Sequence, residues 1–278
     1  MALAKDNPVG VVGFADDGLA HLYRTRMPHP VARAYHRWEN SHPGTIDEVW
    51  KALGFYESLL WTAALVRLAE HLATQLDDSA RASELEREDK LGLWLRQPTL
   101  ATMRAILGYC AARARKQSPR DELDAGAFDP FQDSTSTVDA EAESLRTMRN
   151  SLYHANCREL HPGQVLPRMR EDLGRVGAAF RWLGEERVLG RLRVESGRCT
   201  LAPFVGVGSV SAPIGIDSTE IIGDVADACV AIDSKGNVTS LSPLLTAVES
   251  RWGLAHKMAA AGRWPVLAAN RRTALRVG

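Results

Sequence analysis

The sequence predicts an α+β protein that is mainly helical, with a helical bundle, a small β-rich domain and a basic helical tail in that order. Three observations support this class. Apolar residues recur at steps of three and four through much of the first part of the chain, β-branched residues and glycines alternate after it, and the last segment has cations but no acids. The expected segments are an N-terminal extension at 1–49, the bundle at 50–186, the β domain at 187–248 and the tail at 249–278.

The composition is that of an ordinary globular protein. The chain has 278 residues, of which 45% are hydrophobic and 24% are charged, and these values exclude a wholly disordered chain. The 34 Lys and Arg are balanced by 34 Asp and Glu. Because binding of nucleic acid or anionic lipid over a whole surface needs a basic excess, any site for a polyanion must be local.

Targeting signals and cysteine usage favour the cytoplasm. The longest apolar run, around Leu59–Val66, is far shorter than the roughly 20 residues that cross a bilayer, so we expect no membrane contact. The N-terminus lacks the charged start and apolar stretch of a secretory signal. The widely spaced cysteines match neither a disulfide framework nor a zinc pair, and we expect buried reduced thiols at Cys110, Cys157, Cys199 and Cys229.

Helices are expected where the apolar period and the capping residues agree. Thr45-Ile-Asp-Glu48 matches a capping box, and it opens a long helix that runs to about Leu76 and is apolar on two sides. The first fifty residues, rich in His, Pro and aromatic residues, are typical of an ordered segment that wraps around the bundle. Further helices are expected at Thr99–Lys116, from Val138 through Leu152, and from Pro162 to Leu183.

Strands are expected after Gly184. β-Branched residues cluster at Arg191–Glu195, Cys199–Ala202, Val205–Gly208 and Ala228–Asp233. Asp233-Ser-Lys-Gly-Asn-Val238 predicts a hairpin, because Gly and Asn accept the positive φ of tight turns. The glycines between Phe204 and Ser209 precede no expected helix, which disfavours a phosphate-binding loop there.

The basic tail interleaves its cations with Trp252 and Trp264, and two interpretations stay open. Clustered cations and aromatic rings suit RNA, with Arg271, Arg272 and Arg276 as candidate contacts. The favoured interpretation is an amphipathic helix whose Ala and Leu face docks on its own protein.

The residues with the clearest chemistry form one cluster, Leu145-Arg-Thr-Met-Arg-Asn-Ser-Leu-Tyr-His-Ala-Asn156. Its polar members include Arg146, Arg149, Asn150, Tyr153 and His154. Steps of four place Asn150 beside both Arg146 and His154 on a helix, and Arg149 beside Tyr153. The apolar members at positions 145, 148 and 152 point into the bundle, so the polar residues lie on or near an exposed rim.

Arg149 and His154 suit metal-independent cleavage of RNA. Histidine moves protons near neutral pH, and arginine stays charged while it donates two hydrogen bonds to a phosphate. Together they assist attack of a 2′-hydroxyl on its own phosphate, which leaves a 2′,3′-cyclic phosphate and a 5′-hydroxyl. This chemistry needs no cofactor and no metal. On spacing alone, a histidine near a helix C-terminus beside surface arginines is the commoner explanation.

The segment Arg149-Asn150-Ser-Leu-Tyr-His154 resembles the signature of HEPN (higher eukaryotes and prokaryotes nucleotide-binding) domains, an Arg followed after four to six residues by a His. The polar residue directly after the Arg is common in that family. The resemblance covers about residues 50–186 and implies a bundle of four or five helices. It also implies that Arg149 and His154 form the catalytic pair, that Asn150 positions them, and that two motifs face each other across a homodimer.

Two features bear on this resemblance. His154 is followed by Ala-Asn and not by the x-Tyr of some HEPN toxins, so an antitoxin of the nucleotidyltransferase kind is not implied. Glu57 lies inside the otherwise apolar long helix, where it either faces the cleft and orients Arg149 or His154, or simply faces solvent. Both interpretations stay open. Tyr153, Glu57 and Arg146 are therefore candidate supporting residues.

The predicted function is that of a HEPN endoribonuclease, acting as a toxic effector in bacterial antiphage defence or a toxin–antitoxin system. The β domain is expected to regulate it or to bind a defence complex or antitoxin. The alternative is a catalytically inactive HEPN module that binds nucleotide or helps to assemble a defence complex. The enzyme needs Arg149 and His154 of two protomers near one phosphate, whereas the inactive module tolerates buried or acid-paired side chains.

Overall fold

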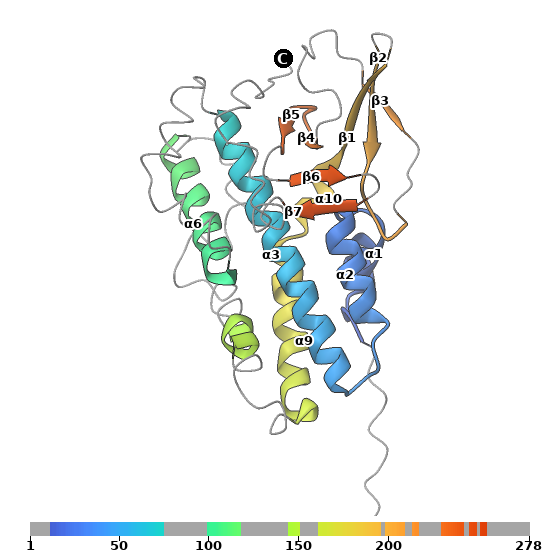
Figure 1. The fold of residues 1–278 in the computed structure, drawn as a ribbon. Coiled ribbons are helices and arrows are strands. Elements are labelled where there is room, and N and C mark those ends of the chain that lie inside the picture. Colours follow the sequence, from blue (N-terminus) through green and yellow to red (C-terminus); the bar gives the residue numbers. More distant parts are fainter. Residues whose placement is uncertain are drawn as a thin grey trace, which may run out of the picture.

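A helical layer and an antiparallel sheet make up the molecule, with the sheet at one end of the helices (Figure 1). The computed structural model describes residues 12–74, 99–117, 144–150, 161–195, 198–208, 213–216, 229–241, 245–248 and 251–254. The combination of helices and sheet confirms the α+β class. No helix among these residues is long and apolar enough to cross a membrane.

Helix α3, Ile46–Thr74, is the central element, and it agrees closely with the long helix expected from Thr45 to Leu76. At its start, Glu48 accepts a hydrogen bond from the Gly44 amide at 2.8 Å, one residue earlier than the Thr45 amide that a capping box uses. The carboxylate of Glu48 is fully buried and also binds Arg170. Helix α3 is therefore fixed at its N-terminus by a side chain that belongs to the core.

Two N-terminal helices, α1 (Asp17–Thr25) and α2 (His29–Glu39), pack beside α3. The Asp16 carboxylate accepts hydrogen bonds from the first amides of α1 and so fixes the start of that helix. Aromatic rings from this region and from α3 meet at centroid distances of 4.8 to 5.8 Å; they belong to Phe14, Tyr23, Tyr35, Trp38 and Phe55. The N-terminal segment thus contributes to the same core as the bundle.

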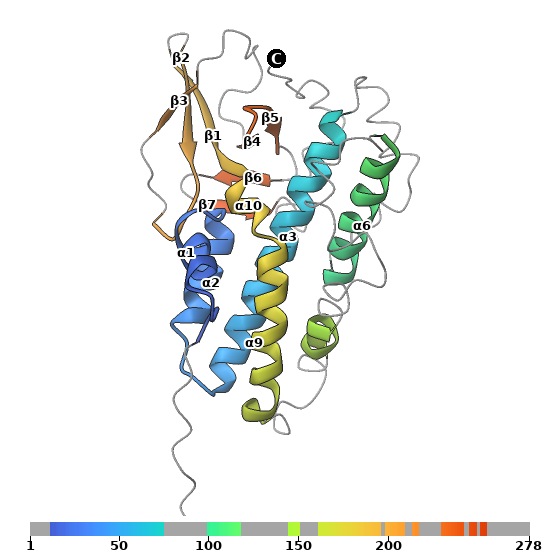
Figure 2. The same cartoon turned by 180° about the vertical axis from the view of Figure 1, so that it is seen from behind.

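Further helical segments of the described part of the chain lie in the same layer (Figure 2). Helix α6 (Leu100–Gln117) matches the helix expected at 99–116 and packs on α3. Residues 144–150 are helical and carry the beginning of the candidate motif. Helix α9 (Pro162–Ala179) also packs on α3 and is followed by the short α10 (Trp182–Glu185). The side chain of Phe14 lies where a Cβ on Gly177 would be, so this glycine lets α9 approach closely.

The sheet contains β1 (Arg187–Glu195), β2 (Arg198–Pro203), β3 (Ile214–Ile216), β4 (Cys229–Asp233) and β5 (Val238–Ser240), in the order β3-β2-β1-β4-β5. The predicted hairpin is confirmed between β4 and β5, where Gly236 has a φ of 82°. Leu189 and Ala231 belong to the same hydrophobic core as the helices. One face of the sheet therefore packs directly on the helical layer.

The segment after β2 joins the sheet to the N-terminal helices. Val205 forms a bridge with Pro28, and does not extend a strand as its β-branched neighbours suggested. The amides of Gly206 and Val207 donate to the carbonyls of Met27 and Arg24 at 2.8 and 3.0 Å. Because these two donors are used, the Gly206 and Val207 amides are not available to hold a phosphate.

The prediction of a helical tail from residue 249 is wrong at its start. Residues Arg251–Leu254 form strand β7, which pairs antiparallel with β6, Leu245–Val248. Trp252 and Gly253 are weak helix formers, and the adjacent Leu-Thr-Ala-Val segment offers a strand partner. The helix was inferred from the charge of the whole tail, which carries no information about local pairing. Residues 255–278 lie outside the described residues.

The described cysteines are free and buried, as predicted: Cys110, Cys199 and Cys229. Cys157 lies outside the described residues. Among the described residues, no three His, Cys, Asp or Glu side chains gather closely enough to hold a metal ion. His29 binds the Gly206 carbonyl through Nδ1 at 2.9 Å, and His36 contacts Asn40, so these N-terminal histidines have separate local partners.

Candidate functional site

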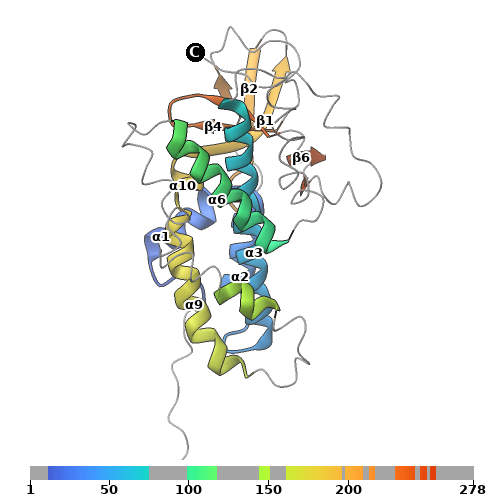
Figure 3. The same cartoon turned by 90° about the vertical axis from the view of Figure 1, so that its left-hand side faces the viewer.

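Arg149 lies at the meeting point of the 144–150 helix and α3, two segments that lie close together in Figure 3. Its Nε donates a hydrogen bond to Glu57 Oε1 at 2.8 Å, across 92 positions of sequence. Its Nη1 donates to the Asn150 Oδ1 at 3.3 Å. Three of the predicted site residues are therefore in direct contact: Glu57, Arg149 and Asn150.

Burial on both helices explains why these polar groups face each other. Leu145 is fully buried, and Met148 packs against the core, so the remaining side of the short helix is left for Arg149. On α3, the neighbours Phe55 and Leu59 are fully buried, whereas Glu57 is only partly buried. The pair forms where the two less buried sides of these helices meet.

The ion pair stays in contact with water. The side chains of Arg149 and Glu57 are each 30% exposed. At this exposure a single ion pair contributes about 1 kcal/mol or less, because water screens the charges. Glu57 therefore orients Arg149 through an ion pair that water weakens.

Arg146 and Asn150 lie one turn apart on the same short helix and are both partly buried. This agrees with the expected rim of polar side chains. Tyr153 and His154, the remaining members of the motif, lie outside the described residues, as do Arg271, Arg272 and Arg276 of the tail. The described part of the site thus consists of Glu57, the two arginines and Asn150.

Sequence reasoning missed Asp172, a buried carboxyl on α9 next to the site helix. Asp172 is 3% exposed, and Ser144 donates a hydrogen bond to its carboxyl group. Burial is the main cause of its raised pKa; the positive charge of Arg168 and the Ser144 hydrogen bond oppose that effect. Its Oδ2 atom is buried and has no hydrogen-bond partner. Only the i, i+4 pair of Arg168 and Asp172 was visible in the sequence, and it looked like an ordinary exposed pair.

Comparisons of the chain with family models, with curated proteins and with solved structures find no match. The case for a function therefore rests on the residues themselves and on their geometry.

Proposed function

We propose that this protein is a metal-independent endoribonuclease of the HEPN type, acting as the toxic effector of a bacterial antiphage defence or toxin–antitoxin system. The active site is composite, with Arg149 and His154 contributed by each of two copies in a homodimer. Asn150 and Glu57 position Arg149. The β sheet provides the surface for regulation or for an antitoxin or defence-complex partner.

The observation that carries this proposal is the contact between Glu57 and Arg149. The first two residues of the motif, Arg149 and Asn150, are in contact on a partly exposed rim. The acid that binds Arg149 is Glu57 of α3, which the sequence suggested as a residue that orients Arg149 or His154. Of the two interpretations of Glu57, the geometry supports orientation of Arg149. An arginine that is held in place on a partly exposed rim is suited to bind the oxygens of a phosphate.

In the proposed reaction, the 2′-oxygen of RNA attacks the adjacent phosphorus while the bond from phosphorus to the 5′-oxygen breaks. His154 accepts the proton of the 2′-hydroxyl, and a water molecule donates a proton to the leaving 5′-oxygen. Arg149 binds the non-bridging oxygens, on which negative charge accumulates. The products are a 2′,3′-cyclic phosphate and a 5′-hydroxyl, and the requirement for a 2′-hydroxyl excludes DNA as substrate.

The decisive experiment incubates the purified protein with total RNA in EDTA and maps the ends of the fragments. We expect 5′-hydroxyl ends with the wild type, and no cleavage with Arg149→Ala or His154→Ala. Arg33→Ala is the matched control, because Arg33 is exposed on α2, away from the site. Intact RNA with the wild type, together with equal toxicity of wild type and His154→Ala on expression in cells, rejects the proposal.

Mixing tests the composite site. A heterodimer of Arg149→Ala and His154→Ala retains one of each side chain, contributed by different copies. Recovery of cleavage on mixing these inactive variants therefore indicates action across the dimer interface. A mixture without cleavage, when light scattering shows that heterodimers have formed, contradicts a site shared in this way.

A second candidate is an inactive HEPN module that binds nucleotide or assembles a defence complex. One observation favours it: Arg149 is already paired with an acid, Glu57. An inactive module predicts that Glu57→Gln has no effect on any RNA cleavage, because none occurs. A nuclease predicts that this variant still cleaves but more slowly, because Arg149 is less well oriented.

A further inference from the structure

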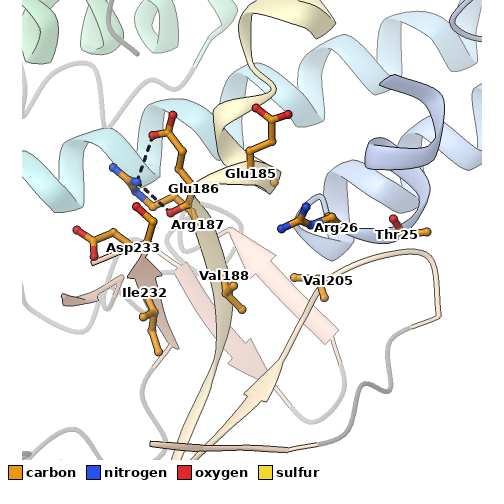
Figure 4. Close-up of a pocket in the computed structure, with 11 residues that line it drawn as sticks. Thr25, Arg26, Glu185, Glu186, Arg187, Val188, Val205, Ile232 and Asp233 are labelled. Carbon is orange, nitrogen blue, oxygen red and sulfur yellow. Dashed lines mark hydrogen bonds and ion pairs between the residues drawn. The ribbon is translucent and has the colours of Figure 1, made fainter. Parts of the chain in front are cut away.

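A cavity of about 150 Å³ lies where the end of α1 and α10 meet the sheet, and its lining does not include the Arg149 motif (Figure 4). Its walls come from the end of α1, from α10, from β1 and β4, and from the segment that follows β2. Pockets for drug-sized ligands occupy about 300–1,000 Å³. This cavity is therefore too small for a nucleotide and fits a molecule of a few carbon atoms.

The floor of the cavity is aliphatic. Val188 on β1 and Ile232 on β4 are directly opposite each other in the strand register, which places their side chains side by side on one face of the sheet. Val205 adds a third branched side chain, and all three are only partly buried. A ligand with a short branched hydrocarbon group gains free energy by covering this floor.

Most charges at the rim already have partners. Arg187 binds Glu70 at 2.5 Å and also contacts Glu186. Glu185 accepts hydrogen bonds from Arg181. Asp233 accepts from the amides of Lys235 and Asn237, as part of the hairpin turn. Arg187 and Glu185 thus have partners of opposite charge, whereas the amide partners of Asp233 are neutral.

Arg26 is different. Within the described residues its guanidinium makes no hydrogen bond or ion pair, and Figure 4 shows it pointing from the end of α1 into the cavity. Arg26 is an exposed cation at the rim, above the aliphatic floor. A carboxylate satisfies the planar fork of an arginine with two parallel hydrogen bonds.

We propose that this cavity is a binding site for a small aliphatic carboxylate, whose carboxylate binds Arg26 and whose branched hydrocarbon group covers Val188, Val205 and Ile232. An inorganic phosphate has no apolar part to cover the floor. This inference is independent of the proposed RNA cleavage.

The test is a titration of the full chain with 3-methylbutanoate, followed by isothermal titration calorimetry and by ligand-observed NMR. A ligand of this size in a partly open site is expected to bind with a Kd on the order of millimolar. The neutral 3-methylbutanamide and inorganic phosphate at equal ionic strength are the comparison ligands, and both are expected to bind at least tenfold more weakly. No saturable binding of the acid, or equal binding of the amide or phosphate, overturns the proposal.

Variants locate the site. Arg26→Gln is expected to lower the affinity by about tenfold or more, since a hydrogen-bonded charge is lost. Val188→Thr, which keeps the shape of the side chain, is expected to weaken binding several-fold by placing a hydroxyl in the floor. Arg33→Gln, an exposed arginine that does not line the cavity, is the control and should bind as the wild type does. Unchanged affinity in Arg26→Gln, with an unchanged Tm, assigns the ligand to another place and refutes the site.

Discussion

Glu48 and Glu57 both lie on α3, and each binds an arginine from a later helix, yet the two ion pairs differ in almost every physical respect. They are separated by two and a half turns, about 180° around the helix, so that one faces α9 and the other faces the 144–150 helix. Glu48 is fully buried and uses both oxygens on Arg170, at 2.6 and 2.7 Å. Glu57 is 30% exposed and has one contact with Arg149, at 2.8 Å.

The difference separates an ion pair enclosed by the core from one that solvent reaches. Glu48 also accepts a hydrogen bond from the Gly44 amide, so all of its partners are protein groups. Loss of these partners would leave a buried charge without compensation. Glu57 and Arg149 are each 30% exposed, so water screens the attraction between them. The same residue types on one helix thus form two kinds of ion pair, and burial sets how much each contributes to stability.

The largest effect is expected at the buried pair. Glu48→Gln leaves Arg170 without its counter-charge, and removing one partner of a buried pair costs about 3–5 kcal/mol. Urea unfolding measures this loss as a lower midpoint at unchanged slope. The double variant Glu48→Gln with Arg170→Met should recover part of the loss. A Glu48→Gln variant as stable as the wild type would show that burial does not distinguish the two pairs.

An intermediate effect is expected at Glu70, the third glutamate of α3 with arginine partners. Its side chain is 19% exposed and binds Arg67 at 2.8 Å and Arg187 at 2.5 Å, and Arg67 lies over the Trp182 ring at 3.8 Å. Glu70→Gln should cost about 1–3 kcal/mol, because charged hydrogen bonds are lost in a partly buried network. Thermal unfolding measures this cost. A larger loss of stability in Glu70→Gln than in Glu48→Gln would contradict the expectation that the more buried glutamate contributes more.

Asp172 extends the comparison to a buried carboxyl whose arginine neighbour is mostly exposed to solvent. Arg168 approaches to 3.6 Å but is 71% exposed. Since the folded pKa of Asp172 is raised, its contribution to stability is present below the unfolded pKa and is lost as the pH rises through the folded pKa. Asp172→Asn should therefore gain about 1 kcal/mol over the wild type at pH 7, and this advantage should shrink as the pH falls toward 3.

The control for that prediction is Glu171→Gln, a neighbouring carboxyl that is 61% exposed on its side chain. It should follow the wild type at every pH. If the difference between Asp172→Asn and the wild type were constant across the pH range, the pKa of Asp172 would have to be the same in the folded and unfolded chains.

The smallest effect on stability is expected at the exposed pair. Glu57→Gln should change the free energy of unfolding by about 1 kcal/mol or less, with any difference disappearing in 1 M salt, because this pair is screened. A double-mutant cycle with Arg149→Gln measures the coupling. A salt-independent coupling as large as that of the buried pair would mean that Arg149 is fixed in place and is not free to bind a phosphate.

Sequence reasoning predicted elements that depend on local pattern. The bounds of α3 and α6 and the hairpin at Asp233 follow from periodicity, capping and turn residues within a few positions of each other. Strand β7 was missed because its partner, and not its own composition, determines its structure. The N-terminal segment was predicted only to wrap around the bundle for the same reason. Its aromatic side chains are part of the core, and this is visible only once the fold places Phe55 beside them.

The candidate site was predictable in its residues but not in its contacts. Arg149 and Asn150 were identified by their order in one short segment. Their acid partner lies 92 positions away, and Glu57 was only one of two open interpretations. Asp172 gave no usable signal, because its environment depends on how α9 meets the 144–150 helix.

The bonds between the first helices and the segment after β2 also have a consequence for biosynthesis. His29 and Gly206, which are joined by a hydrogen bond, are separated by 177 positions. At about 5–20 residues per second, a ribosome needs roughly 10–40 seconds to add that much chain. During this time the carbonyls of Arg24 and Met27 lack the amides of Val207 and Gly206, so these contacts of the N-terminal helices form only after residue 207 has been translated.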